Sequence, residues 1–282
     1  MQRIERSVIY MEKWALITGA SSGIGAELAK LYASRGYNIA LTARRADRLA
    51  DLAMKLPAKT RILVHDLADR EECEALYDDV SDLNIELLVN CAGFGAVGKF
   101  ETLDLDRQIQ MTDINCVAPL ILTHMFLKDF KYRDKGAILN VASSAGLLPG
   151  GPNMAVYYAS KAYLTSLTSA IAEELRAGGS SVKIAALCPG PVDTEFNDVA
   201  GVKFSLKGIT PAYCAKCAAR GLDNGEVIII PEEKIRLLSF ATRFAPRRLT
   251  VAVTGLQIIP SELQNLGGVV PSIKELLTDP KE

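Results

Sequence analysis

The fold of this 282-residue chain is decided by one stretch, Thr18-Gly19-Ala20-Ser21-Ser22-Gly23-Ile24-Gly25. A short apolar run, residues 14–18, leads into it, and a helical pattern with Leu28 and Leu31 on one side follows at residues 26–34. Glycines between a strand and a helix permit a tight turn and a close approach of the backbone to a pyrophosphate, which then lies at the positive end of the helix. The stretch therefore predicts a dinucleotide site at a strand-to-helix turn.

The same alternation of short apolar runs and helical stretches continues along the chain. Strands are also predicted at residues 39–42, 61–64, 85–89, 137–141, 182–187 and 226–230. Helices are predicted at residues 46–56, 70–81 and 212–222, within 105–131 and within 154–177. Strands this apolar fit a parallel sheet that is buried on both faces. We expect an α/β fold, a doubly wound (Rossmann-type) parallel sheet of about seven strands with helices on both faces, followed by a C-terminal helical extension.

We expect three regions along the chain. Residues 1–12 are polar and charged and form an N-terminal tail without an export signal. Residues 13–231 form a dinucleotide-binding and catalytic domain, and residues 232–282 form a helical extension packed on it. The extension mixes basic and apolar residues, which favours helices with their basic side chains outward. A basic amphipathic helix in a membrane interface is the alternative, but Pro246 interrupts the pattern and we do not expect a membrane contact.

Composition excludes several classes of function. Lys plus Arg total 32 and Asp plus Glu total 33, so a formal net charge of −1 gives no reason to expect a nucleic-acid partner. Six cysteines without a secretory segment fit reduced thiols and a cytoplasmic location. Cys214 and Cys217 form a CxxC pair on a predicted helix, where we expect small core residues. We expect no metal site, because His65 and His124 are the only histidines.

The pair Tyr157 and Lys161 is the candidate for the chemistry. Near the start of a helix, residues four apart share one face, so an ammonium would lie close to a phenol. A nearby positive charge favours the phenolate, and such a pair can transfer a proton near neutral pH. Taken alone, YxxxK is more often an ordinary helical pattern, so the assignment depends on the other motifs.

The glycine spacing from Gly19 to Gly25 resembles that of the short-chain dehydrogenase/reductase family, whose motif reads TGxxxGxG. Other motifs similar to those of the family follow in order as far as Thr194. They are an adenine-contacting acid at Asp66, an NNAG-like segment at Asn90-Cys91-Ala92-Gly93, a helical Asn at Asn115, a Ser-x-x-Gly at Ser143 to Gly146, the Tyr157 and Lys161 pair, and Pro189-Gly190-Pro191-Val192-Asp193-Thr194. Cys91 departs from the family pattern, which has a second Asn there.

The resemblance implies hydride transfer between a nicotinamide and a carbonyl or alcohol. Tyr157 is then the general acid and base, and Lys161 lowers its pKa and binds the ribose. Ser143, chosen over Ser144, orients the carbonyl, and Asn115 holds a relay water. The cofactor contacts implied by the resemblance are Gly19, Ser21, Ser22, Gly23, Ile24, Gly25, Arg44, Arg45, Asp66, Leu67, Asn90, Ala92, Gly93, Tyr157, Lys161, Pro189, Gly190, Val192 and Thr194.

The end of the second predicted strand indicates NADP(H) rather than NAD(H). A site that selects NAD usually places an acid there to bind the ribose 2′-hydroxyl. Here Ala43 takes that place, and Arg44 and Arg45 follow. A guanidinium binds a phosphate with paired hydrogen bonds, so Arg44 is our first choice for the 2′-phosphate and Ser21 our second. Cations are disfavoured at a helix start unless an anion compensates them, and the phosphate would do so.

The expected partners are a small carbonyl or alcohol substrate and further copies of the chain. Apolar residues after Thr194, such as Phe196 and Val199, indicate a hydrophobic substrate, whereas Asp193 and Glu195 are expected at a solvated loop edge. Family resemblance and the apolar surface of the two long helices, within residues 105–131 and 154–177, imply a homodimer or homotetramer. A non-catalytic NADP(H) sensor and a membrane-peripheral binding protein remain alternatives, but the intact set of catalytic residues favours an enzyme.

Overall fold

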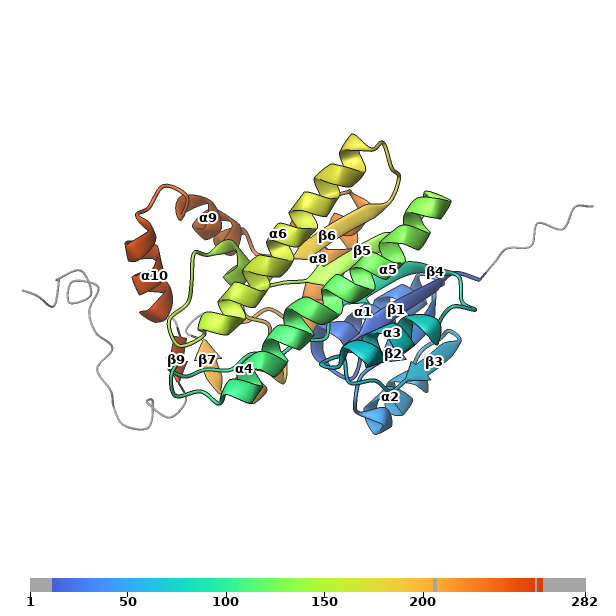
Figure 1. The fold of residues 1–282 in the computed structure, drawn as a ribbon, viewed down its shortest axis with the longest axis horizontal. Coiled ribbons are helices and arrows are strands. Elements are labelled where there is room, and N and C mark those ends of the chain that lie inside the picture. Colours follow the sequence, from blue (N-terminus) through green and yellow to red (C-terminus); the bar gives the residue numbers. More distant parts are fainter. Residues whose placement is uncertain (1–11, 205–206, 257, 261–282) are drawn as a thin grey trace, which may run out of the picture.

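The computed structural model describes residues 12–204, 207–256 and 258–260 (Figure 1). The N-terminal tail expected at residues 1–12 therefore lies outside the described residues except for Glu12, and so does the extension from residue 261 onward.

The main sheet has seven strands, each parallel to its neighbours. They are β1 (Trp14–Thr18), β2 (Asn38–Thr42), β3 (Thr60–Leu63), β4 (Ile85–Asn90), β5 (Ala137–Val141), β6 (Lys183–Leu187) and β8 (Ile228–Ile229). Their order is β3-β2-β1-β4-β5-β6-β8, so the direction of winding reverses between β1 and β4. At such a switch point, the loops beyond the carboxyl ends of the strands diverge and leave a crevice.

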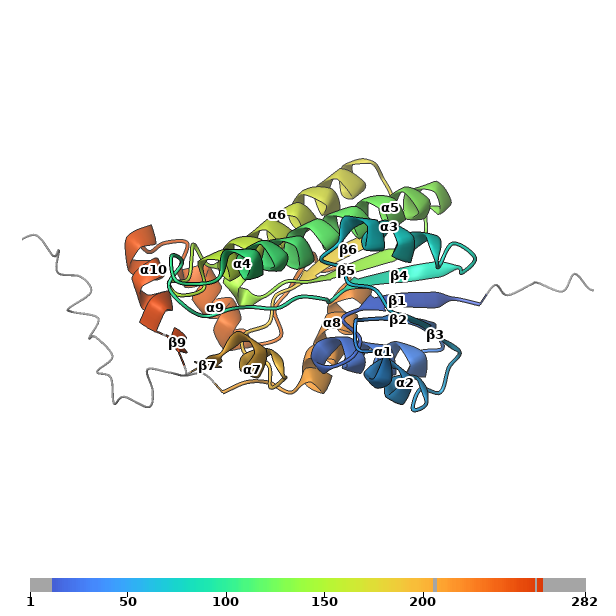
Figure 2. The same ribbon diagram turned by 60° about the horizontal axis from the view of Figure 1, so that its bottom comes forward.

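Helices cover both faces of this sheet (Figure 2). One face carries α1 (Gly23–Ser34), α2 (Ala46–Ala53) and α8 (Pro211–Asp223). The other carries α3 (Arg70–Asp78), α5 (Ala118–Arg133) and α6 (Ala155–Ala177). On β1, Ala15 and Ile17 pack in the core of the first face, while Trp14 and Leu16 pack in that of the second. Burial on both faces explains why the strand is apolar at nearly every position, and the predicted doubly wound fold is confirmed.

The helix predicted within residues 105–131 has an irregular turn in its middle. It begins as α4 (Leu105–Thr112), continues through a π-helical turn, η1 (Asp113–Val117), and becomes α5. A π-helical turn adds a residue to the helical repeat and is frequent at functional sites. Asn115 lies inside this turn and is buried.

The chain leaves the main sheet twice, after β6 and after β8. After β6 it forms α7 (Phe196–Ala200) and β7 (Val202–Phe204), and after β8 it forms α9 (Glu233–Ala241), α10 (Arg247–Leu256) and β9 (Ile258–Pro260). β7 and β9 pair as an antiparallel two-stranded sheet. The prediction of a helical extension is therefore incomplete, because a three-residue strand whose partner lies far away in the sequence leaves no local pattern. Among the described residues, no helix is long and apolar enough to span a bilayer.

Candidate active site

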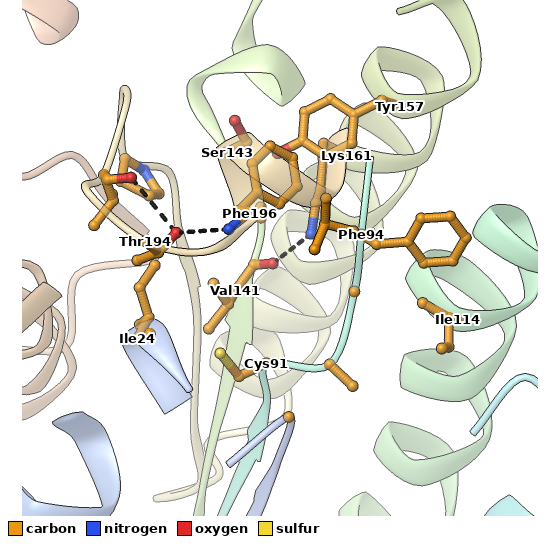
Figure 3. Close-up of a pocket in the computed structure, with 18 of the residues that line it drawn as sticks. Ile24, Cys91, Phe94, Ile114, Val141, Ser143, Tyr157, Lys161, Thr194 and Phe196 are labelled. Carbon is orange, nitrogen blue, oxygen red and sulfur yellow. Dashed lines mark hydrogen bonds between the residues drawn. The ribbon is translucent and has the colours of Figure 1, made fainter. Parts of the chain in front are cut away.

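A cavity of about 500 Å³ lies beyond the carboxyl ends of β1, β4, β5 and β6. Its wall includes the glycine turn after β1, the segment after β4 and the start of α6, and α9 of the extension adds Ile235 and Leu238. Figure 3 shows the part of this wall where residues from these separate segments meet. The cavity therefore occupies the crevice at the switch point.

The glycine turn fits closely against the segment that follows β4. Gly19 has φ +65°, and a Cβ there would lie 2.8 Å from the Cα of Ala92. The Thr18 hydroxyl accepts hydrogen bonds from the backbone N–H groups of Cys91 at 2.9 Å and Ala92 at 3.0 Å. A Cβ on Gly25 would strike the Gly19 carbonyl. Glycine is therefore required at both ends of this turn for backbone to approach backbone.

The N-terminus of α1 faces the cavity. The helix begins at Gly23, and Ser22 before it makes no side-chain capping hydrogen bond. The first N–H groups of a helix lack partners inside the helix and bind anions well. Ser21, Ser22, Gly23 and Ile24 line the cavity at this point. The turn therefore has the features of an anion-binding helix N-terminus at the place where the sequence predicts a pyrophosphate.

Tyr157 and Lys161 lie one turn apart near the start of α6, and both are buried on its cavity side. The Lys161 ammonium donates a hydrogen bond to the Val141 carbonyl at 2.9 Å and lies 5.8 Å from the centroid of the Tyr157 ring. Figure 3 shows both side chains and the Ser143 hydroxyl gathered at one end of the cavity. The spacing in the sequence has produced the expected common face.

Burial controls the proton affinity of both groups. It raises the pKa of Tyr157 to about 12, and a hydrogen bond with Ser143 lowers this pKa only in part. Burial also lowers the pKa of Lys161. Burial is thus the largest influence on the pKa of the phenol, and the Lys161 ammonium donates its hydrogen bond to the Val141 carbonyl.

Ser143 follows β5 and precedes a short 3₁₀ turn, η2 (Ser144–Leu147). Its hydroxyl accepts a hydrogen bond from the Ala145 N–H at 3.1 Å and also bonds to the Tyr157 phenol. Ser144 lines the same cavity, and its backbone N–H donates to the Pro189 carbonyl at 2.7 Å. Of these two serines, Ser143 is the one beside the tyrosine.

The side chain of Asn115 connects three segments around Lys161. Its Nδ2 donates to the Phe94 carbonyl and to the Ser160 hydroxyl, each at 3.0 Å, and its Oδ1 accepts from the Phe94 N–H at 3.2 Å. Both amide hydrogens are thus used within the protein. The π-helical turn is what brings this side chain to the segment after β4.

Two residues predicted to contact a cofactor do not line the cavity. Asn90 is buried between the sheet and α5, where its Nδ2 donates to Asn140 Oδ1 at 2.8 Å and to Thr123 Oγ1 at 3.1 Å. Asn140 in turn donates to Thr168 Oγ1 at 2.9 Å. Through these hydrogen bonds Asn90 joins the sheet to α5 and α6, so its amide is not available to a group in the crevice. Gly25, the second residue, is buried in α1 and is not part of the cavity wall.

The two arginines after β2 have different surroundings. Arg44 lies 3.5 Å from Asp66 at the surface. Arg45 reaches the glycine turn, where it donates to the hydroxyls of Ser21, at 2.9 and 3.2 Å, and Ser22, at 3.0 Å. Within the described residues, Arg45 and not Arg44 is therefore the arginine that contacts the turn, although both line the cavity.

Glu195 also lies at this end of the cavity. One of its oxygens accepts a hydrogen bond from Arg45 at 2.9 Å and the other accepts one from Arg48. The bond with Arg45, followed by the bond with Arg48, lowers the pKa of the carboxyl. Glu195 is exposed, as expected for a loop edge, but its carboxylate also forms two ion pairs that were not predicted. Sequence reasoning missed them because roughly 150 residues separate Glu195 from its partners.

The remaining predicted contacts surround the cavity. Asp66 and Leu67 follow β3, and Ala92 and Gly93 follow β4. After β6, the wall is formed by Pro189, Gly190, Val192 and Thr194. The Gly190 N–H donates to both carboxylate oxygens of Glu232, at 3.2 and 3.3 Å, and burial raises the pKa of Glu232. The start of the extension thus supports the segment after β6.

Sequence reasoning missed much of the apolar wall beside Tyr157. Phe196 lies with its ring centroid 5.3 Å from that of Tyr157, and Phe94 and Ile114 come from the other side (Figure 3). Met154 and Leu238 complete this apolar region. Only the apolar content of the stretch after Thr194 indicated it in advance.

Comparisons with known proteins agree with this geometry. The profile of the short chain dehydrogenase family matches residues 13–202. The very-long-chain 3-oxoacyl-CoA reductase of Aspergillus clavatus is 34% identical over 181 residues, which are 61% of this chain and 52% of the reductase. The chain therefore spans about half the length of the curated relatives it matches.

Solved structures share the fold over most of their length. A short-chain dehydrogenase from Sphingobium yanoikuyae in complex with NADPH has a TM-score of 0.73 and 28% identity, covering 82% of this chain and 94% of that chain. The bulky-bulky ketone specific alcohol dehydrogenase from Comamonas testosteroni has a TM-score of 0.69 and 27% identity, covering 82% and 92%. Other similar structures hold NAD or NADP.

Proposed function

This chain belongs to the short-chain dehydrogenase family of oxidoreductases, and we propose that it is an NADP(H)-dependent enzyme that interconverts a hydrophobic carbonyl compound and its alcohol. The observation that carries the proposal is the position of the Tyr157 phenol, which is buried in the cavity wall, hydrogen-bonded to Ser143 and one helical turn from Lys161. When bound, the nicotinamide supplies or receives the hydride, and the residues of the chain handle the proton.

Each of these residues has a distinct role in the proposal. Tyr157 donates a proton to the carbonyl oxygen of the substrate and accepts it in the reverse direction. Ser143 orients that oxygen, because its hydroxyl lies beside the phenol. Lys161 binds the ribose. Asn115 positions the segment after β4, and because both of its amide hydrogens are bonded within the protein, only an oxygen of Asn115 is left to hold the relay water. The residues present fit a nicotinamide dinucleotide. The glycine turn, the N-terminus of α1 and the segments after β3, β4 and β6 all line one continuous cavity.

The pKa of the phenol gives a pH prediction. Because burial raises the pKa of Tyr157 to about 12, the phenol keeps its proton at neutral pH and loses it only as pH rises through that value. Carbonyl reduction uses the protonated form and should be flat between about pH 6 and 9. Alcohol oxidation uses the phenolate, whose fraction rises about tenfold per pH unit below the pKa, and its kcat/KM should rise in parallel. Initial rates in both directions across this range provide the test, and reduction that declines with a midpoint near pH 7 would contradict the assignment.

Two observations support NADP(H) as the cofactor. The position after β2 holds Ala43 rather than an acid, and Arg44, Arg45 and Ser21 line the cavity beside it. Arg45 already bonds to the hydroxyls of the glycine turn, so a guanidinium and two serines lie where the adenosine ribose would be held.

The apolar wall supports a hydrophobic substrate. Phe94, Ile114, Met154 and Phe196 surround the space beside Tyr157, and α9 adds Leu238. The similar reductase acts, by its name, on very-long-chain 3-oxoacyl-CoA, and the similar alcohol dehydrogenase on bulky ketones. We therefore propose a ketone or aldehyde with a large apolar substituent.

A carbonyl panel tests the proposed function directly. Purified protein with NADPH should reduce hydrophobic ketones or aldehydes, followed by the loss of absorbance of the reduced nicotinamide. Binding of NADPH without turnover of any compound in a broad panel of ketones, aldehydes and alcohols would instead favour a non-catalytic NADP(H) sensor.

We also propose a homodimer or homotetramer. Leu105, Ile109, Leu120 and Tyr163 are exposed on α4, α5 and α6, which lie together on one face of the sheet (Figure 1), and apolar side chains at this density favour association. Light scattering at micromolar concentration should give two or four times the mass of one chain. A monomer mass would contradict this proposal and leave the catalytic one unaffected.

A further inference from the structure

Glu195 binds the guanidinium groups of Arg45, which lines the cavity, and of Arg48. Its carboxylate accepts from Arg45 at 2.9 Å and from Arg48, and Arg45 at the same time donates to Ser21 and Ser22 in the glycine turn. A carboxylate and a phosphate offer similar oxygen acceptors to a guanidinium. Glu195 and a 2′-phosphate therefore compete for the same N–H groups.

Charge in this region also favours competition. Three guanidinium groups (Arg44, Arg45 and Arg48) face two carboxylates (Asp66 and Glu195), which leaves a formal net charge of +1. A phosphate monoester brings about −1.5 to −2 at pH 7. With a phosphate charge of −2 bound, the region has a net charge of −1 if both carboxylates stay and becomes neutral if one of them leaves. Arg45, Arg48 and Glu195 are each about half exposed, and exposed ion pairs contribute little to stability, so displacement of Glu195 costs little.

The segment that carries Glu195 also covers the catalytic tyrosine. Phe196, the next residue, packs its ring against Tyr157 (Figure 3). Thr194, the residue before, packs against the glycine turn: a Cβ on Gly23 would lie 3.1 Å from the Thr194 methyl group. At the other end of α7, the Ala200 carbonyl accepts from the Val97 N–H at 3.1 Å and the Val199 carbonyl accepts from Arg107 at 3.0 Å. The segment is thus held at both ends, and Glu195 forms the ion pairs at the end nearer the nucleotide.

We propose that Glu195 is a cofactor-specificity residue that occupies the 2′-phosphate position on Arg45 until a 2′-phosphorylated nucleotide displaces it, which releases the Glu195 end of α7 and lets Phe196 move from above Tyr157. This inference rests on the proposed use of NADP(H). In this inference the Glu195 carboxylate competes with the 2′-phosphate for the same guanidinium. Nucleotide binding at the adenosine end of the cavity is thereby coupled to access of the substrate to Tyr157.

Nucleotide binding to the full chain, measured by calorimetry, tests the displacement without any turnover. The probes are adenosine 2′,5′-bisphosphate and adenosine 5′-monophosphate, which differ by the 2′-phosphate. Glu195→Gln removes the competing charge and should tighten binding of the bisphosphate by about three- to tenfold, the range expected for losing half-exposed ion pairs, with the monophosphate unchanged. Asp198→Asn is the matched control, because it removes an exposed carboxylate from α7, the helix that Glu195 precedes, and should change neither affinity.

Hydrogen exchange of the α7 amides provides the second readout. The bisphosphate should speed their exchange in the wild-type chain and the monophosphate should not, while Glu195→Gln should exchange quickly without any nucleotide. Weaker or unchanged bisphosphate binding by Glu195→Gln, or an equal gain from Asp198→Asn, would overturn the inference and leave the proposed cofactor standing. If the wild-type chain bound the bisphosphate no better than the monophosphate, the NADP(H) proposal would fail and this inference with it.

Discussion

Tyr157→Phe should lower turnover by roughly 10²- to 10⁴-fold, the loss typical of removing a general acid, while folding and nucleotide binding stay nearly intact. The aromatic ring of Tyr157 packs against Phe196, and phenylalanine preserves that contact. Only the hydroxyl, which bonds to Ser143, is removed. Steady-state rates with saturating NADPH and a responsive ketone give the measurement, and the thermal unfolding midpoint checks the fold.

Tyr158→Phe is the matched control for this variant. Tyr158 lies next in α6 and also lines the cavity, and burial raises its pKa as well, so chemistry at the wrong tyrosine is a real alternative. The ring of Tyr158 contacts the backbone at Gly151, which suggests a packing role, and its hydroxyl should be dispensable within a factor of about three. Equal activity of the two variants, or a larger loss in Tyr158→Phe, would show that the active site has been assigned to the wrong residue.

Ala43→Asp combined with Arg44→Gln should shift the ratio of NADPH to NADH catalytic efficiency toward NADH by about 10²-fold. Hydrogen bonds to charged groups contribute about 1.5–3 kcal/mol, but Arg44 is largely exposed, so repulsion by the new carboxylate supplies much of the effect. An acid at this position can also accept from a ribose 2′-hydroxyl, which adds affinity for NADH. The ratio of kcat/KM values for the two cofactors measures the shift.

Arg35→Gln gives a control for simple loss of positive charge. Arg35 follows α1 and pairs with Asp223 at 2.9 Å on the outer side of the sheet, away from the cavity wall. Its replacement should leave the cofactor ratio unchanged. A wild-type chain that used NADH as well as NADPH would refute the cofactor assignment but not the assignment of Tyr157.

Much of the fold could be predicted because the relevant signals are local. Buried parallel strands such as β1 are apolar at nearly every position, and the glycine turn requires glycine wherever backbone meets backbone. The pair Tyr157 and Lys161 was also local, since helical periodicity alone places both on one face. These features are encoded within a few neighbouring residues.

Other features depend on partners far away in the sequence. Asn90 carries the family motif, but whether its amide faces the cavity or the helices is decided by Asn140 and Thr123. The ion pairs of Glu195 form only after β2 and β6 are placed in the sheet. The pKa of Tyr157 depends on how deeply the phenol is buried, which no spacing reveals. Such properties follow from tertiary structure, and the sequence pattern could not predict them.

The pairing of β7 with β9 has a consequence for synthesis on the ribosome. β8, the last strand of the main sheet to be made, ends at Ile229, and β9 begins 29 residues later at Ile258. At about 5–20 residues per second, roughly 1.5 to 6 seconds separate the two in translation. The nascent chain can therefore complete its nucleotide-binding sheet while β7 still lacks its partner. The small β7–β9 sheet is consequently completed after the main sheet, and a pause in translation between β8 and β9 would lengthen that delay.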